Sequence, residues 1–475
     1  MSNKVERMKN SLILDTDSYK PSHWLQYPPK TEFVFSYIES RGGQFSEMMF
    51  AGLQPFAKEY LSRQVTQQDI EDADAFLTAH GLPFNRKGWE RLIEKHNGYL
   101  PLKIKAAPEG KILPVLVPMV TVINTDPEFY WMTSYIETAL LRAIWYMSTV
   151  GTISWSIKKL ILSYLDRTGD PAGISFKLHD FGARGVSSKE SGSLGDLAHL
   201  FNFMGTDTIV GIIAAMEYYN ATVMPAFSIP AAEHSSITSW GRDKEVDAYR
   251  NMIKQFGKPG ALVAVVSDSY DIMKACDLWG TELKQDVIDS GAIVVIRPDS
   301  GDPATVVLDV VRRLDKNFGS VKNAKGYKVL NNVRVIQGDG VNEVSIRGIL
   351  MNLEFAGYSA DNVAFGMGGA LLQQMNRDTQ KFAMKASAAR IDGKWVDVYK
   401  DPVTDTGKRS KRGRITLVER AGEFQTVLED EVEGLASKGW TEVLQTVWEN
   451  GKLLKDWTLD EVRAEANKPF VKETA

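Results

Sequence analysis

Acidic, basic and glycine residues gather along the middle of this 475-residue chain, each time directly after a short apolar run. Carboxylates bind hydroxyl groups and metal-bound water, and guanidinium groups bind phosphate. Glycine turns let backbone N–H groups approach an anion. These residue types together suit a phosphorylated sugar and a divalent cation. The clusters read HDFGARG from His179, PAAEHS from Pro230, SDSYD from Ser267, RPDSG from Arg297, QGDG from Gln337 and GMGG from Gly366.

The acids of these clusters have two possible roles. Asp268, Asp271, Asp299 and Asp339 each follow an expected strand. An aspartate in that position can cap the next helix. Several carboxylates converging from separate loops would instead hold ribose hydroxyls and Mg²⁺ on a diphosphate. Arg297, two residues before Asp299, offers a planar fork of donors to a phosphate.

Three residues near HDFGARG could hold a flat ring that carries an amide. Phe181 could stack on the ring, or it could cap the core of the domain. Arg184 could bind an amide oxygen or a phosphate. Asp207, within GTDT, could accept a hydrogen bond from an amide NH₂ group or cap the helix that begins near Thr208.

The remaining candidates are weaker when taken alone. Gly368 and Gly369 could cradle a phosphate or form a tight turn between strand and helix. His234, one of six histidines, could be reactive or structural. The chain has no HExxH motif or Cys/His spacing, so a zinc site is not expected. The basic run Lys400–Arg414 could be a solvated loop, a nuclear localisation or nucleic-acid patch, or a contact to an anionic substrate.

The elements that position these clusters alternate between strand and helix, which predicts βαβ units and a parallel sheet. Nearly every cluster lies at the carboxyl end of a strand, and in an α/β barrel these ends meet at one mouth. An open sheet would divide them about a switch point. We therefore expect an irregular α/β barrel. The expected strands are Ile174–Leu178, Ala226–Ile229, Leu262–Val266, Ile293–Ile296, Val333–Ile336 and Val363–Phe365.

The flanking segments have another pattern. Strand signals at Leu12–Leu14 mix with a helical pattern at Glu47–Leu61, and hairpins follow Lys381. We expect residues 1–150 and 382–475 to form one discontinuous α+β domain. Residues 151–381 then form the barrel that interrupts it.

Composition narrows the class of protein. Lys plus Arg (56) nearly balance Asp plus Glu (60), and the net charge of −4 does not favour binding to nucleic acid or an anionic membrane. The single cysteine, Cys276, fits a reducing compartment. No signal peptide and no apolar run of membrane-spanning length is visible. We expect a cytoplasmic protein.

The motifs together carry a family resemblance. HDFGARGVSSKESG, GTDT, PAAEHSSIT, VSDSYDI, IRPDSGDP and VIQGDGV follow one another in this order, between TDSYKPSHWLQYPP and KDPVTDTGKRSKRGR. They resemble the nicotinamide phosphoribosyltransferases, a family of type II phosphoribosyltransferases. The resemblance implies transfer of the phosphoribosyl group of phosphoribosyl pyrophosphate (PRPP) to nicotinamide, in NAD salvage. It also implies Mg²⁺, ATP as co-substrate, and a homodimer with active sites at the subunit interface.

The resemblance implies a role for each matching residue. Phe181 and Tyr19 of the partner subunit would clamp the nicotinamide ring, Asp207 would accept the carboxamide NH₂, and Arg184 would lie nearby. His234 would be phosphorylated by ATP and would act in catalysis with Arg297, Asp299 and Asp271. Asp271 and Asp299 would hold the metal, directly or through water. Arg297, Asp299, Gly338, Asp339, Gly368 and Gly369 would bind ribose and phosphate, and Arg41, Arg377, Lys385, Lys400 and Lys408 would bind pyrophosphate.

The sequence departs from the family pattern at Ala183, where vertebrate members carry tyrosine, and at Met367 and Gln374 near the glycine turn. A nicotinate phosphoribosyltransferase is the nearest alternative. A phosphate-binding aldolase or isomerase barrel would need a Schiff-base lysine or a glutamate base at a strand end. A non-enzymatic binding protein would not need so many charged groups at one mouth.

Overall fold

The structure is a computed structural model that describes residues 2–401 and 410–470. The chain divides into two units. Unit 1 consists of residues 1–152, 217–220 and 376–475, and unit 2 of residues 153–216 and 221–375.

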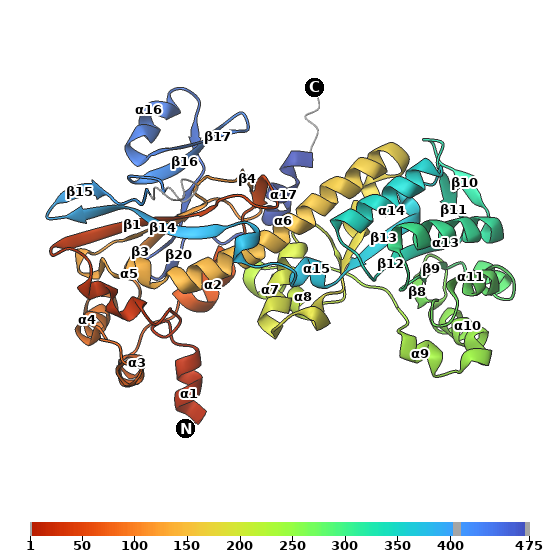
Figure 1. The fold of residues 1–475 in the computed structure, drawn as a ribbon, viewed down its shortest axis with the longest axis horizontal. Coiled ribbons are helices and arrows are strands. Elements are labelled where there is room, and N and C mark those ends of the chain that lie inside the picture. The colour runs from red at the N-terminus through yellow and green to blue at the C-terminus, as the bar shows by residue number, and fades with distance from the viewer. Residues whose placement is uncertain (1, 402–409, 471–475) are drawn as a thin grey trace. The chain divides into compact units, whose positions relative to one another are not determined.

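Unit 2 is built on a six-stranded sheet in the order β7-β6-β13-β12-β9-β8, in which every neighbouring pair is parallel (Figure 1). Its strands are short and largely buried, as expected for strands covered on both faces. They are β6 (Leu178–Asp180), β7 (Gly205–Thr206), β8 (Leu262–Val266), β9 (Ile293–Arg297), β12 (Val333–Gln337) and β13 (Val363–Met367). A separate two-stranded sheet pairs β10 (Ser320–Lys322) with β11 (Lys328–Leu330).

One irregular segment joins the two outer strands of this sheet. Phe227 forms a parallel bridge with Gly205 of β7, and Ala231 forms one with Ala264 of β8. Its backbone hydrogen bonds run from Phe227 N to Met204 O (2.7 Å) and from Ala264 N to Pro230 O (2.9 Å). The sheet therefore curls, and the segment closes it. This architecture confirms the expected irregular α/β barrel.

Two of the expected strands are wrong in detail. Ile174 lies in a 3-10 helix, Pro171–Phe176, and the strand begins only at Leu178. Ala226–Ile229 forms a single bridge, at Phe227, rather than a strand, because Pro225 and Pro230 have no N–H to donate to a ladder. Gly205–Thr206, by contrast, forms a strand that the sequence pattern had not indicated.

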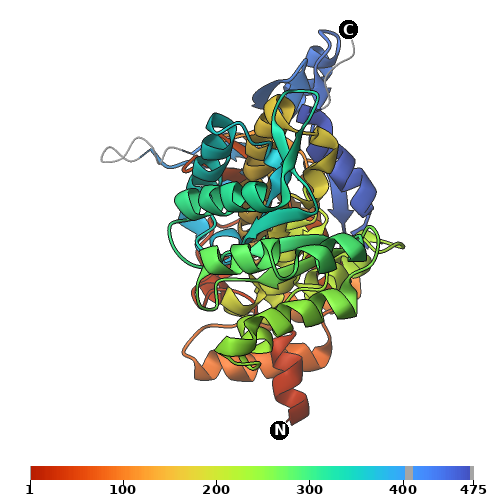
Figure 2. The same ribbon diagram turned by 90° about the vertical axis from the view of Figure 1, so that its right-hand side faces the viewer.

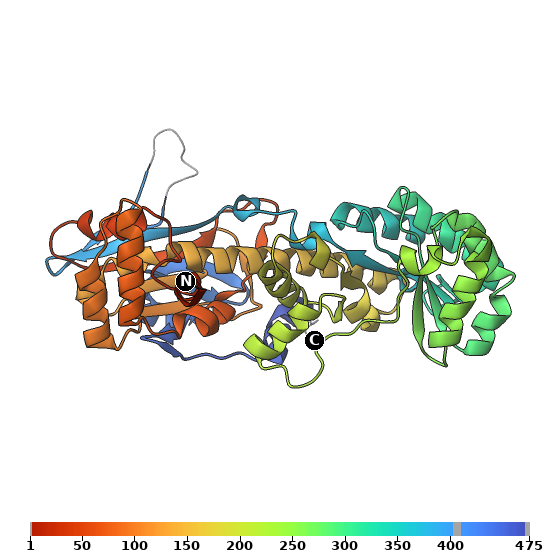
Figure 3. The ribbon, with the colours of Figure 1, turned by 90° about the horizontal axis from the view of Figure 1, so that it is seen from below.

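Helices surround the strands of unit 2, as the green and teal segments show (Figures 2 and 3). The helix α13 illustrates why they form: Asp302 caps its first turn by accepting Thr305 N, and Val307, Val310 and Leu314 bury one face. The helices are α7 (Lys189–His199), α8 (Ile209–Tyr219), α9 (His234–Thr238), α10 (Glu245–Phe256), α11 (Ile272–Gly280), α12 (Lys284–Ser290), α13 (Pro303–Phe318), α14 (Glu343–Phe355) and α15 (Gly369–Leu372).

Unit 1 contains a seven-stranded antiparallel sheet in the order β15-β14-β1-β5-β3-β19-β20. These strands are β1 (Thr31–Ser40), β3 (Leu102–Ala106), β5 (Val120–Asn124), β14 (Phe382–Ile391), β15 (Lys394–Asp397), β19 (Gln445–Glu449) and β20 (Lys452–Leu453). Two smaller sheets contain β2 (Glu47–Met49) with β4 (Ile112–Pro114), and β16 (Ile415–Arg420) with β17 (Glu423–Leu428) and β18 (Thr441–Glu442).

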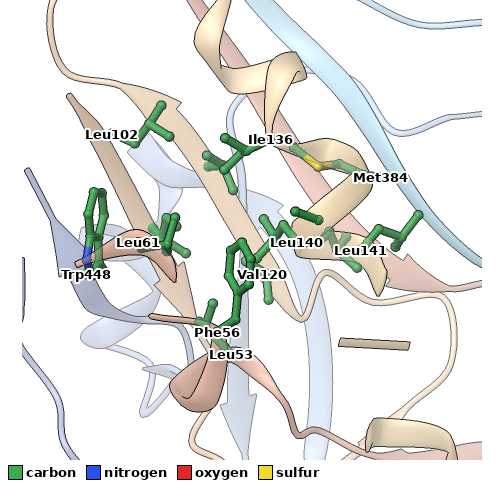
Figure 4. Packing of buried hydrophobic residues seen from close by; sticks show 14 of the residues in the cluster. Leu53, Phe56, Leu61, Leu102, Val120, Ile136, Leu140, Leu141, Met384 and Trp448 are labelled. Atoms are coloured by element: carbon green, nitrogen blue, oxygen red, sulfur yellow. The ribbon is translucent and has the colours of Figure 1, made fainter. Parts of the chain in front are cut away.

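The core of unit 1 joins strands from both ends of the chain. Leu102 and Val120 pack with Met384 and Trp448 in one buried cluster (Figure 4). Leu12–Leu14, expected as a strand, lies in turns, and Glu47–Leu61 splits into β2, α2 and a π-helical turn. The helices are α1 (Ser2–Lys9), α2 (Leu53–Phe56), α3 (Gln67–Ala79), α4 (Arg86–His96), α5 (Met132–Tyr135), α16 (Val432–Ala436), α17 (Leu459–Asn467) and α6 (Glu137–Thr168), which continues into unit 2.

Across the described part of the chain, no helix combines the length and the apolar character needed to cross a membrane.

A buried carboxyl group stabilises the start of α2. The residue before α2, Gly52, has φ +104°, and a Cβ there would lie 2.3 Å from Ala143 O, so no capping side chain fits. Glu109 replaces it by accepting Gly52 N (3.0 Å) and Gln54 N (2.9 Å). Burial raises the pKa of Glu109 to about 7, although these hydrogen bonds oppose the shift.

This raised pKa predicts a pH dependence of stability. Between the ordinary value of 4.5 and about 7, the folded protein holds a proton that the unfolded chain has lost. The free energy of unfolding should therefore fall by about 3 kcal/mol as pH rises through this range. Glu109→Gln should abolish this component, whereas the exposed Glu433→Gln should keep it. Urea unfolding at pH 5 and pH 7 measures this change in the free energy of unfolding. An equal change in both variants would refute the assignment to Glu109.

Candidate functional site

The carboxyl ends of the unit 2 strands bring the sequence-predicted residues Phe181, Gly338 and Asp299 together. A Cβ on Gly338 would lie 3.2 Å from Asp299 Oδ1 and 3.4 Å from Phe181 Cε2, so both side chains flank this glycine. Gly338 follows β12, Asp299 follows β9 and Phe181 follows β6. Three loops that are distant in sequence thus meet because their strands are parallel neighbours or near neighbours.

Phe181 lies over the apolar interior of the barrel. It packs against the buried cluster of Ala264, Val295 and Ile336. Phe181 and this cluster line a cavity of ≈ 700 Å³ whose lining also includes Asp207. A half-buried aromatic ring on a cavity can both close the core and receive a flat ligand.

Asp207 is exposed, but neighbouring groups fix it in place. Its carboxylate oxygen Oδ1 accepts the Ser228 hydroxyl at 2.7 Å, and its backbone N–H donates to Asp180 O at 3.0 Å. Ser228 belongs to the segment that closes the sheet, and it also lines the cavity. No sequence pattern indicated Ser228, since only closure of the sheet brings it to Asp207.

Arg297 and Asp299 form the charged part of the rim. Arg297 Nη2 lies 3.5 Å from Asp299 Oδ2. Burial raises the pKa of Asp299; the neighbouring Arg297 and His234 lower it, and Asp268 and Asp339 raise it. Arg297 Nε is buried and has no hydrogen-bond partner among residues 2–401 and 410–470. An unsatisfied guanidinium nitrogen beside carboxylates suits a phosphate or a sugar oxygen.

His234 begins α9 and pairs with an acid. Its Nε2 lies 3.0 Å from Oδ1 of Asp268, whose side chain is nearly buried. If Nε2–H donates a hydrogen bond to Asp268, the lone pair of the neutral ring lies on Nδ1. Asp268 was noted as a strand-end acid but received no role in the sequence interpretation. Its position within SDSYD was the available signal.

Asp271 and Asp339 have different surroundings. The carboxylate oxygen Oδ1 of Asp271 caps α11 by accepting Met273 N and Lys274 N, both at 3.0 Å. Asp339 is exposed, and its carbonyl oxygen accepts Gln337 Nε2 at 2.7 Å. Asp271 thus acts as a helix cap in this structure. Asp268 and Asp339 instead raise the pKa of Asp299.

The described residues contain no group of three His, Cys, Asp or Glu side chains that could hold a metal ion. Mg²⁺ commonly binds through one or two carboxylates, several waters and the phosphates of a substrate. The mutually repelling acids around Asp299 fit such a water-rich site and do not fit a cage made of protein ligands alone.

The glycine turn after β13 contacts the Phe181 loop. Phe181 N donates to Met367 O at 3.0 Å, and a Cβ on Gly368 would lie 3.6 Å from Phe181 O. A Cβ on Gly185 would lie 3.8 Å from Gly369 Cα, so the exposed Arg184 belongs to a loop beside this turn. Met367 is buried, and Gln374 Nε2 lies 3.8 Å from a Cβ placed on Gly369.

Unit 1 carries its own group of cations. Burial lowers the pKa of Lys385, and the charges of Arg41, Lys400 and Arg377 lower it further, against the opposing effect of Glu137. Four predicted pyrophosphate ligands are therefore neighbours, whereas Lys408 lies outside the described residues.

Two side chains of unit 1, Arg41 and Tyr19, present groups that a ligand could contact. Arg41 Nε lies 3.3 Å from Glu39 Oε1, while the buried Arg41 Nη2 has no hydrogen-bond partner in the described ranges. Tyr19 is 55% exposed, and its ring packs edge-on against His23 at 5.0 Å between centroids. An exposed aromatic face of this kind can stack on a ring.

Sequence comparison places these features in a family. Residues 176–451 match the model of the nicotinate phosphoribosyltransferase (NAPRTase) family, and residues 11–104 match the N-terminal domain of nicotinamide phosphoribosyltransferase. A protein from Xanthomonas campestris pv. campestris named nicotinamide phosphoribosyltransferase is 57% identical over 96% of this chain and 98% of its own. A protein of the same name from Acinetobacter baylyi is 34% identical over 94% of this chain and 95% of its own.

Solved structures share the fold. A nicotinate-nucleotide pyrophosphorylase from Pyrococcus furiosus aligns with a TM-score of 0.60 at 16% identity, covering 98% of this chain and 95% of that one. Human nicotinic acid phosphoribosyltransferase aligns with a TM-score of 0.55 at 16% identity, covering 95% and 92%.

The packing around Phe181 predicts the effect of one added methyl group. A Cβ on Gly366 would lie 2.0 Å from Phe181 Cε2, so Gly366→Ala must displace the ring. We expect overpacking to lower the free energy of unfolding by about 1–3 kcal/mol. The matched control Gly348→Ala on α14 places its Cβ 3.4 Å from Ala304 Cβ on α13 and should stabilise α14 by up to about 1 kcal/mol. Urea unfolding and crystal structures of both variants test this; an unmoved Phe181 ring in Gly366→Ala would contradict it.

Proposed function

The chain belongs to the nicotinate phosphoribosyltransferase family and groups with the nicotinamide phosphoribosyltransferases, and we propose that it transfers the phosphoribosyl group of PRPP to nicotinamide. The products are nicotinamide mononucleotide and pyrophosphate. The observation that carries this proposal is the Asp207 carboxylate, held by Ser228 on the same cavity as the Phe181 ring. A carboxylate acceptor beside an aromatic face suits an aromatic amide.

The ring is held so that its nitrogen can attack. Phe181 stacks on one face, and Tyr19 of the partner subunit covers the other face in a homodimer. Asp207 accepts the carboxamide N–H, and Arg184 lies on the neighbouring loop. The pyridine nitrogen attacks with its own lone pair and needs no general base, so the contribution of these residues is orientation.

The reaction exchanges one bond at the anomeric carbon of PRPP. The bond from this carbon to the pyrophosphate oxygen breaks, and a bond to the pyridine nitrogen forms. Positive charge develops on the ribose ring, and Asp299 with its neighbour Asp339 stabilises it while binding the hydroxyls. Arg297, Gly338, Gly368 and Gly369 hold the ribose and its 5′-phosphate, for which the unsatisfied Arg297 Nε is one available donor.

The leaving pyrophosphate carries the opposite charge. Arg41, Arg377, Lys385, Lys400 and Lys408 bind it, from either subunit of the dimer. Mg²⁺, when bound, stabilises the leaving oxygens. Asp271 and Asp299 would hold this ion, directly or through water. The lone buried cysteine fits a cytoplasmic location for this chemistry.

ATP supports the reaction through His234. Asp268 fixes one ring nitrogen of this histidine, which orients the other to accept a phosphoryl group from ATP. An N–P bond forms as ADP leaves, and water later hydrolyses this N–P bond. The direct test is to incubate the protein with nicotinamide, PRPP and Mg²⁺ and to measure the mononucleotide with and without ATP.

We expect Asp207 to select the amide over the acid. Its carboxylate accepts an N–H from nicotinamide but repels the carboxylate of nicotinic acid. Asp207→Ser should therefore lower the ratio of kcat/KM for nicotinamide over nicotinate by about tenfold or more. Ser228→Ala should have a smaller effect in the same direction, since it removes one donor to Asp207.

Steady-state assays with both rings give this ratio, and Asp309→Ser, at a partly exposed position on α13, serves as the matched control. An unchanged ratio in Asp207→Ser would refute the assigned role. A wild-type preference for nicotinate would favour the alternative, a nicotinate phosphoribosyltransferase.

We further expect His234→Ala to abolish both the ATP-dependent gain in rate and the labelling of the protein by ATP carrying a radioactive γ-phosphate. Asp268→Asn should reduce the labelling rate by about tenfold, because the orienting charge is lost. The surface variant His80→Ala should still be labelled. Labelling that persists in His234→Ala would exclude this residue as the acceptor.

A further inference from the structure

Two fully buried aspartates lie directly behind the proposed ring-binding residues. Asp180 ends β6 immediately before Phe181, and Asp196 lies on α7. Both side chains are 0% exposed. The family resemblance assigns neither residue a role, and neither lines the cavity itself.

Asp180 connects the two loops that carry Phe181 and Asp207. Its carboxylate accepts Gly182 N at 2.7 Å from the first loop and the Thr208 hydroxyl at 2.6 Å from the second. Its backbone oxygen accepts Asp207 N at 3.0 Å. Asp180 therefore forms hydrogen bonds beside both residues that are proposed to bind nicotinamide.

Asp196 reaches the same pair of loops from α7. Its Oδ1 accepts the Thr206 hydroxyl at 2.7 Å, and Thr206 Oγ1 in turn accepts Thr208 N at 2.9 Å. The carboxyl groups of Asp196 and Asp180 are close enough for each to shift the pKa of the other. Thr206 and Thr208 flank Asp207 and are themselves buried.

The contact between the two acids requires a proton. Asp196 Oδ2 is buried and finds no N–H or O–H donor in the described part of the chain. The α8 backbone lies against this oxygen, because a Cβ on Gly211 would lie only 2.1 Å from it. Two carboxylates cannot bond while both are ionised, but a protonated Asp196 can donate to Asp180.

The electrostatic surroundings agree with this assignment. Burial raises the pKa of Asp196 well above its ordinary value, and the charges of Asp180 and Asp207 raise it further. Asp180 is the better place for the negative charge, since it accepts donors from both Thr208 and Gly182.

We propose that Asp196 is a positioning residue whose protonated carboxyl group bonds Asp180 and so fixes the Phe181 and Asp207 loops relative to each other. The role rests on the proposed function, because it matters for catalysis only if these two residues hold the ring. It predicts that loss of the carboxyl group weakens binding of the ring more than binding of PRPP, whose proposed ligands lie on other loops.

The test distinguishes an effect of the acid pair on ring binding from a general loss of stability. Asp196→Ala should raise KM for nicotinamide by about tenfold, the worth of a hydrogen bond to a charged group, while KM for PRPP changes by less than about twofold. Asp196→Asn retains an oxygen for Thr206 and an N–H for Asp180, so it should restore KM for nicotinamide to within about twofold of wild type.

A matched control comes from the opposite end of the strands. Asn362, fully buried just before β13, accepts Leu330 N and donates to Lys328 O. Asn362→Ala should lower the melting temperature without changing KM for nicotinamide. Equal increases of both KM values in Asp196→Ala, or an unchanged KM for nicotinamide, would overturn the proposal.

Infrared difference spectroscopy observes the proton directly and needs no activity. At pH 9, where Glu109 is ionised, wild-type protein should show a carboxyl C=O band that shifts in D₂O and is missing in Asp196→Asn. Absence of that band from wild type, or its persistence in the variant, would overturn the proposal even if Asp196→Ala does not fold. If the enzyme proves not to use nicotinamide, the proposed function fails while the band still decides the state of the pair.

Discussion

The parallel alignment of the unit 2 strands is the constraint on which the site depends. Each strand delivers its following loop to the same rim, so residues more than a hundred positions apart become neighbours. The closing segment from Phe227 to Ala231 completes the arrangement, since it bridges the two outer strands and carries Ser228 to Asp207. Without this closure, the apolar interior under Phe181 would open to solvent and Asp207 would lose its partner.

Buried charge is the second constraint, and the protein meets it in two ways. Where the carboxyl group is structural, as in Glu109 and the pair formed by Asp180 and Asp196, backbone N–H groups, hydroxyls or a proton satisfy it. At the candidate site, by contrast, the carboxyl group of Asp299 has other acids close by, and their charges repel it. A cation or a developing positive charge on the ligand would relieve that repulsion, which favours binding of such a species.

The sequence predicted the barrel because short β-branched runs followed by polar clusters repeat, and this pattern depends on burial of both sheet faces. It predicted Leu262–Val266 with the observed bounds but missed β7 and misplaced the strand near Ile174. Two-residue strands have no periodicity to detect, and proline-flanked segments pair only because tertiary structure holds them. The sequence also could not indicate Ser228 or Asp196, because each gains its importance from a partner brought near by folding.

The donors that the fold leaves unpaired point to anionic ligands more directly than the net charge does. Arg297 Nε in unit 2 and Arg41 Nη2 in unit 1 are buried without a hydrogen-bond partner in the described chain. Leaving such a donor unsatisfied costs about 1–3 kcal/mol each. The ligand-free protein can bear this cost at a binding site, because an oxygen of the bound ligand then accepts the hydrogen bond. Phosphate presents several such oxygens to a guanidinium group. Each unit therefore carries its own buried donor that an anion could satisfy.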